Sequence, residues 1–159
     1  MHQSKRQMKT LRNPNDRNEI VSRVELVRPE TPRKWGKMTA HQMICHLSDS
    51  FLGVMGEKPI SIAPGWVLRG AIKWIALYTP LPWAKGMPTR PEMDQQKGGT
   101  PPAEFSEDVR QLLQLTQRFT KEPRDFSWQP HPFFLQMSDQ DWMRWGYLHM
   151  NHHLRQFGL

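Results

Sequence analysis

Three histidines in the chain have the residue type and spacing of a shared metal site. The C-terminal stretch YLHMNHHLRQFGL carries His149 and His153, four positions apart. On an α-helix this spacing places both imidazoles on one face, one turn above the other. A mononuclear site needs at least one more ligand, and His46 is the best donor elsewhere in the chain. The pattern therefore predicts a metal held by His46, His149 and His153.

This ligand set indicates a catalytic rather than a structural ion. Neutral imidazole binds zinc, nickel, copper and iron, and we expect zinc or nickel here. Three protein ligands leave a coordination position for water or substrate. A metal with an open position acts as a Lewis acid or lowers the pKa of a bound water or thiol. Asp49 and His131 are the candidate general bases for such a reaction.

Two neighbours of the late histidines are expected to support the site. His152 also lies near the face of His149 and is the alternative ligand to His153. We prefer His153 because it lies closer to the line through His149 and Gln156, which leaves His152 to flank the site. A ligating imidazole donates its second ring proton to an acceptor, for which Gln156 and Asp49 are the candidates.

A non-catalytic interpretation also fits these residues. The histidines would then hold a structural ion or none, and the protein would be a metal-binding or dimerising interaction module. The chain has seven tryptophans, and residues 65–77 form a short, apolar segment. Both features suit the interface of a homodimer, which we expect under either interpretation.

The elements that carry the histidines have clear helix starts. Thr39 and Gln42 form a capping box, followed by a helix through His46 that ends near residue 53 or 56. Ser138 and Asp141 form a second box at the start of the helix that carries the late histidines. Both boxes predict that the metal-binding side chains project from regular helices.

The rest of the chain predicts further helices and no strand. Apolar stripes at helical spacing mark a first helix, capped by Asn15 or Asp16, and another over about residues 102–119. A short helix is expected over residues 65–77. No segment shows the alternation of a strand, so the fold class is all-α.

A long irregular segment, residues 79–102, contains six prolines and three glycines. Loops of this length in compact domains are commonly lids or binding loops. Arg90, Glu92 and Asp94 are the expected pocket contacts of this loop. The alternative is an ordered wrap that covers the helices.

Composition sets the remaining limits. The 159 residues suit a single domain, and the single cysteine excludes an internal disulfide and favours the cytoplasm. No apolar run reaches the ~20 residues that span a bilayer.

The net charge of +7 lies partly in residues 1–13, which we expect to be a flexible basic tail. The positive charge is the only feature that favours a nucleic-acid partner, and because no nucleic-acid-binding motif is recognisable we do not expect one.

The sequence resembles the DinB/YfiT-like metalloenzyme superfamily, in an uncharacterised branch known as a domain of unknown function. The shared pattern is a tryptophan, a histidine within a helix, and a late His-x-x-x-His followed by Arg and Gln. Its positions here are Trp35, His46, His149, His153, Arg155 and Gln156. The resemblance implies an up-and-down four-helix bundle with an extra short helix and a long proline-rich loop. It also implies a metal-dependent transferase or hydrolase that acts on a small molecule, with a low-molecular-weight thiol as cosubstrate.

Overall fold

The computed structural model describes residues 8–65 and 69–159. Within these ranges the chain forms α-helices and one 3-10 helix, and no strand. The elements are α1 (Pro14–Glu25), α2 (Ala40–Val54), α3 (Arg69–Tyr78), η1 (Pro91–Met93), α4 (Phe105–Phe119) and α5 (Asp139–Gln156). The all-α prediction is confirmed. The expected start of the short helix lies partly outside the described residues, because these omit 66–68.

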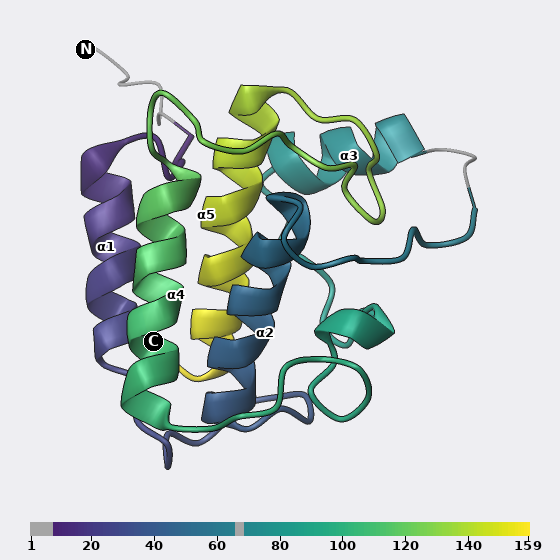
Figure 1. The fold of residues 1–159 in the computed structure, drawn as a ribbon. Helices are drawn as coiled ribbons and strands as arrows, with labels where there is room; N and C mark the ends of the chain where they lie inside the picture. The colour runs from purple at the N-terminus through teal and green to yellow at the C-terminus, as the bar shows by residue number, and fades with distance from the viewer. Residues whose placement is uncertain (1–7, 66–68) are drawn as a thin grey trace.

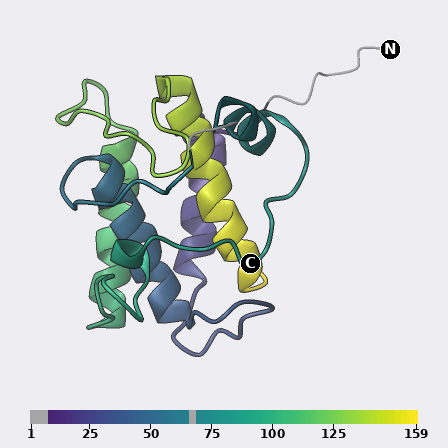
Figure 2. The ribbon, with the colours of Figure 1, turned by 90° about the vertical axis from the view of Figure 1, so that its right-hand side faces the viewer.

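The four longer helices lie alongside one another with nearly aligned axes, and α3 lies to one side (Figure 1). The closest packing joins α2 to α4 and α1 to α5, while α3 contacts α5 and η1 contacts α2. The segment between α3 and α4 crosses the face formed by α5 and α2 (Figure 2). That segment is the proline-rich loop, so the loop and the two histidine-bearing helices meet on one side of the protein.

The starts of α2 and α5 are those that the sequence predicted. The Thr39 hydroxyl accepts the backbone N–H of Gln42 at 3.1 Å, and the Gln42 side chain accepts the Thr39 N–H at 2.9 Å. Ser138 and Asp141 exchange the same pair of bonds at 3.1 and 2.9 Å. Each box satisfies two backbone donors that a helix end otherwise leaves unpaired. The two helices that carry the histidines are therefore fixed at their first turns.

Two other helix starts differ from the prediction. The cap of α1 is Asn13, whose side-chain oxygen accepts the backbone N–H groups of Asn15 and Asp16. The residues predicted as caps are thus the ones being capped. Helix α4 begins three residues later than expected, because the Glu104 carboxylate supplies its cap by accepting the Glu107 N–H at 3.1 Å.

The segment before α1 was expected to be a flexible tail as far as residue 13. Its first part, residues 1–7, lies outside the described residues. Leu11, by contrast, is fully buried, and its backbone N–H donates to the Met143 carbonyl at 3.0 Å. The second half of this segment is therefore packed against α5.

The core between the four helices depends on a close approach at Gly146 in α5. A Cβ atom at this position would lie 2.7 Å from Leu11 Cδ1 and 3.0 Å from Phe119 Cε1. Both neighbours are fully buried, so neither has room to retreat. Packing in such interiors tolerates added methyl groups poorly.

We expect Gly146→Ala to lower the free energy of unfolding by about 1–2 kcal/mol, because overpacking outweighs the gain in helix propensity. Gly70 in α3 is the matched control, since a Cβ there would meet nothing within 4 Å. Gly70→Ala should leave stability unchanged or raise it. Urea unfolding followed by circular dichroism measures both, and equal effects of the two variants would contradict this account.

Candidate metal centre

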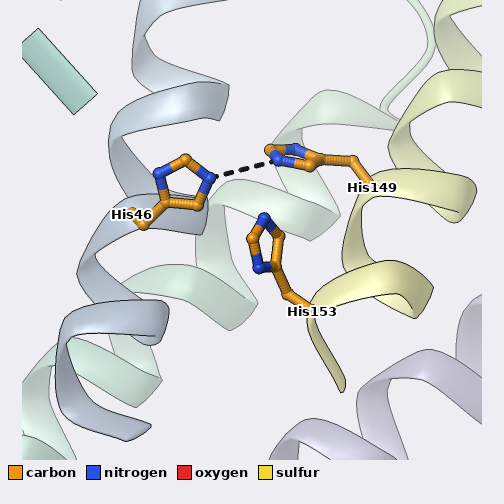
Figure 3. A group of neighbouring side chains, drawn as sticks. All are labelled: His46, His149 and His153. Atoms are coloured by element: carbon orange, nitrogen blue, oxygen red, sulfur yellow. Dashed lines mark hydrogen bonds between the residues drawn. The ribbon is translucent and has the colours of Figure 1, made fainter. Parts of the chain in front are cut away.

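The structure brings His46, His149 and His153 together. His46 projects from α2, and His149 and His153 project from α5 toward it (Figure 3). One ring nitrogen from each residue lies within 4.8 Å of the other two. His46 and His153 are buried and His149 is partly exposed. Residues about a hundred positions apart in the sequence thus form one cluster of imidazoles.

The spacing of the ring nitrogens fits a tetrahedral ion. Nε2 of His46 and Nε2 of His149 are 3.2 Å apart (Figure 3). Two nitrogen ligands at 2.0–2.1 Å from a tetrahedral zinc ion are separated by about 3.3 Å. The two atoms already have the separation that a shared metal requires.

The tautomer of His46 is set by a backbone carbonyl. Its Nδ1–H donates to the Met93 carbonyl of η1 at 2.9 Å. The proton therefore sits on Nδ1, and the lone pair of Nε2 faces His149. A metal-ligating histidine usually has an acceptor of this kind on its second nitrogen.

The tautomer of His153 is set by Gln156, one of the two candidate acceptors named from the sequence. His153 Nδ1–H donates to the Gln156 side-chain oxygen at 2.9 Å, and the Gln156 amide donates to the Trp35 carbonyl at 2.9 Å. The backbone N–H of Lys34 also donates to the Gln156 carbonyl at 2.7 Å. Gly36 makes this clasp possible: its φ is +81°, and a Cβ there would lie 2.3 Å from Gln156 Nε2. The segment before α2 therefore holds the last turn of α5.

His149 is held by stacking. Its ring lies between those of Trp145 and Trp83, with centroids 4.9 and 6.1 Å away and tilts of 31° in both cases. Among the described residues its Nδ1 is buried without a hydrogen-bond partner. The aromatic neighbours, rather than an acceptor, aim its Nε2 at His46.

Burial keeps the three imidazoles neutral. It lowers the pKa of His46, and it lowers the pKa values of His149 and His153 well below the usual value. The cause is the loss of hydration by the charged ring, and for His149 and His153 the neighbouring imidazoles add to it by charge repulsion. Neutral rings have free lone pairs, which is the form that binds a metal.

His152 lies beside this cluster. Its ring packs near Trp35 and Trp83, with centroids 6.0 and 5.9 Å away, and 5.2 Å from that of His153. It lines the cavity described below. Its nitrogens are not among the atoms that converge between the other three.

Asp49, a predicted base, lies outside that cavity and is fully buried. Its carboxylate accepts the N–H and hydroxyl of Thr100 at 2.8 and 2.6 Å and the Gln95 amide at 2.9 Å. Lys58 completes the set at 2.8 Å. Asp49 thus fastens the loop segment around residues 95–100 to α2.

His131, the other predicted base, forms part of the cavity wall. Its Nδ1 accepts the backbone N–H groups of Phe133 and Phe134, both at 3.1 Å, and its ring stacks on Phe134 at 4.4 Å. Burial lowers its pKa to about 3. The ring therefore closes a tight turn as a neutral acceptor.

The three loop residues divide into two groups. Asp94 lines the cavity. Arg90 and Glu92 instead bind Ser61, with the Arg90 guanidinium donating to its hydroxyl at 2.7 Å and the hydroxyl donating to Glu92 at 3.0 Å. These bonds join the loop to the segment that follows α2.

The cluster opens onto a cavity of about 1490 Å³, lined by residues of α2, α3 and α5, of the segment before α2, and of the loops that follow α2, α3 and α4. Its lining includes all three histidines, together with Trp83 and Met93. Sequence reasoning did not find these last two residues. Met93 acts through its backbone carbonyl, which the residue type does not reveal. Trp83 could have been found, because a tryptophan in an irregular loop is a candidate binding residue.

A second polar cluster, formed by His41, Cys45 and Asp108, lies between α2 and α4. Asp108 accepts from the His41 ring at 2.7 Å and from the Cys45 thiol at 3.7 Å. Burial and the nearby carboxylate raise the pKa of Cys45 to about 12. The thiol therefore stays protonated and serves as a hydrogen-bond donor between the helices.

The buried turn at His131 predicts a pH dependence of stability. Between pH 6.5 and 3 the unfolded chain binds a proton at this position and the folded chain does not, so stability falls as the pH falls through that range. His131→Asn keeps an acceptor for the turn but cannot titrate. The slope of unfolding free energy against pH between 6 and 4 should be shallower in this variant, by up to about 1.4 kcal/mol per pH unit. Unchanged slopes in urea unfolding would show that His131 takes up its proton in the folded state.

None of the described helices is long and apolar enough to cross a membrane.

Comparison with known proteins places the chain in one family. No curated protein and no solved structure matches the chain. A family described as "Protein of unknown function (DUF1569)" matches residues 5–158, which is nearly the whole sequence. The chain therefore belongs to the DUF1569 family.

Proposed function

We propose that the protein is a metal-dependent enzyme with a mononuclear site formed by His46, His149 and His153. The observation that carries this proposal is the 3.2 Å separation of the His46 and His149 Nε2 atoms inside a cluster of neutral imidazoles. Hydrogen bonds to Met93 and Gln156 turn two of the rings so that Nε2 faces inward. We infer zinc or nickel as the metal, from the all-nitrogen ligand set.

The cavity favours a catalytic site over a structural one. A structural ion is enclosed by four protein ligands, whereas these three histidines leave one coordination position open. The three histidines line a cavity large enough for an organic substrate, which could reach a metal held there. When bound, the metal supplies Lewis acidity, or a water or thiol that is ionised near neutral pH.

The chain's own side chains have holding roles in this proposal. Met93 and Gln156 fix the proton positions of two ligands, and Trp83 and Trp145 fix the plane of the third. Asp49 holds the loop that presents the Met93 carbonyl. His131 forms part of the wall of the cavity.

We infer the reaction class and the wider kinship from the sequence resemblance. We propose an up-and-down four-helix bundle of the DinB/YfiT-like superfamily, which the near alignment of α1, α2, α4 and α5 supports. The reaction would then be a group transfer or a hydrolysis of a small molecule. A low-molecular-weight thiol is the cosubstrate that this kinship implies.

A non-catalytic, dimerising metal-binding module is the second candidate. Trp74 on α3 favours it, because this large aromatic side chain is 60% exposed. Activity screens with thiol acceptors and hydrolysable esters, run on zinc-loaded protein, separate the two candidates. A zinc-loaded dimer without turnover would favour the module.

We expect one zinc or nickel ion per chain, lost on His149→Ala. Removal of one of three ligands leaves two imidazoles, which are too few to hold an ion through dialysis. His41→Ala is the control, because it removes a histidine from the second polar cluster and should retain the metal. Elemental analysis after dialysis measures both variants, and equal retention would remove His149 from the site.

We expect Gln156→Leu to weaken zinc binding by about 10–100-fold, because loss of the acceptor frees the His153 ring to turn. Gln140, an exposed residue of the same type on the same helix, is the matched control. Gln140→Leu should bind zinc as the wild type does. Competition titrations with a chromophoric chelator measure the affinities, and equal affinities of the two variants would count against the role of Gln156.

A further inference from the structure

The cavity beside the three histidines is unusually large and apolar. Its volume of about 1490 Å³ exceeds the ~300–1,000 Å³ of most small-molecule sites. Aromatic side chains from four separate segments line it: Trp35, Trp83, Phe133, Phe134 and Trp145. Such walls fit the body of a sizeable apolar ligand better than a small polar one.

Apolar side chains that are exposed to solvent also gather at this cavity. Ile72 and Ile75 of α3 are 51% and 46% exposed, and Leu81 and Met87 of the following loop are both 63% exposed. All four line the same cavity. Apolar residues that remain exposed and contiguous commonly mark a ligand-binding groove. A bound apolar molecule would cover them.

The charged side chains at the cavity are mostly cationic. Lys37, Lys58, Arg69 and Lys97 line it, against the single carboxylate of Asp94. Lys97 pairs with Asp94 at 3.4 Å, and Lys58 pairs with Asp49 behind the wall at 2.8 Å. Among the described residues Lys37 and Arg69 have no carboxylate partner. The remaining residues, 1–7 and 66–68, include neither aspartate nor glutamate.

Arg69 is the best placed of these cations to meet a ligand. Its Nε and Nη2 donate to the carbonyls of Gly65 and Ala63, which fix the guanidinium in place. Its Nη1 is buried and has no hydrogen-bond partner in the described part of the chain. A buried cationic donor without an acceptor is costly, and an anionic group supplies both the charge and the acceptor.

We propose that the cavity binds an amphipathic carboxylate, with an apolar body against the aromatic walls and its anionic group on Arg69. This inference deepens the proposed function, because the same cavity opens onto the three histidines. The apolar body then fills the space between Arg69 and the histidine cluster. Substrates of this class carry an apolar skeleton rather than the many hydroxyl groups of a sugar.

The test uses cis-parinaric acid, a fluorescent polyene carboxylate, and its methyl ester. Tryptophan residues line the cavity, so energy transfer from tryptophan to the bound probe reports binding. The wild type should bind the acid about tenfold more tightly than the ester, which is the usual effect of one charge-assisted hydrogen bond. Arg69→Met should remove this preference by weakening acid binding alone, and Arg69→Lys, which keeps the charge, should restore part of it.

Arg110→Met is the matched control, because Arg110 lies exposed on α4 and does not line the cavity. It should keep the wild-type preference. Zinc binding is measured separately in every variant and should be unchanged in Arg69→Met. Failure of zinc binding in the wild type would count against the metal site and leave the Arg69 result to stand by itself.

Two outcomes would overturn the inference. The first is equal binding of acid and ester by the wild type, or an unchanged preference in Arg69→Met. The second is probe binding that weakens as the protein forms dimers at higher concentration, measured by light scattering. In that case a second copy of the chain, rather than a carboxylate, covers the exposed apolar residues.

Discussion

Two neutral imidazole nitrogens held 3.2 Å apart in a buried space repel each other unless a proton or a cation lies between them. Much of the surrounding structure serves to keep them there. Hydrogen bonds donated to Met93 and Gln156 hold two of the rings, and two tryptophans pack against the faces of the third. Burial prevents relief by full protonation, because it lowers the pKa of each ring. A neutral His149 relieves this repulsion by donating its Nε2–H to His46, and a cation can take the place of that proton.

Asp49 extends this constraint from the helices to the loop. Four donors converge on its carboxylate, three of them from Gln95 and Thr100 of the proline-rich segment. A buried carboxylate with so many partners is strongly fixed, and it fixes the backbone that surrounds it. Met93 lies two residues before Gln95, the first of these loop donors in the chain. The Asp49 carboxylate does not line the cavity, yet it fixes the loop that carries the Met93 carbonyl. It therefore helps to set the direction in which His46 donates its proton.

The sequence predicted the helices that carry the site because their starts have local signals. Thr39 with Gln42 and Ser138 with Asp141 are complete capping boxes, and the spacing of His149 and His153 needs only a helix to bring them together. The N-terminus of α1 was predicted less well, because Asn13, Asn15 and Asp16 are all good caps and only Asn13 is followed by proline at the first helical position. The roles of Asp49 and His131 depend on partners far away in the sequence, and a backbone carbonyl such as that of Met93 leaves no trace in residue type. Those features follow from tertiary packing, which periodicity does not reveal.

The clasp between Gln156 and the segment at Lys34–Gly36 places a ligand in the last turn of a helix, where fraying is easiest. Loss of the clasp would let that turn sample many conformations, and His153 would leave the cluster with it. If the proposed site binds an ion, part of the binding free energy goes into ordering a few terminal residues, so the affinity would depend on local entropy as well as on the ligands. In the proposed metal site, a molecule that contacts Trp35 or the end of α5 would therefore change the affinity for the ion without touching it. The stability of the C-terminal turn would then set how long an ion stays bound.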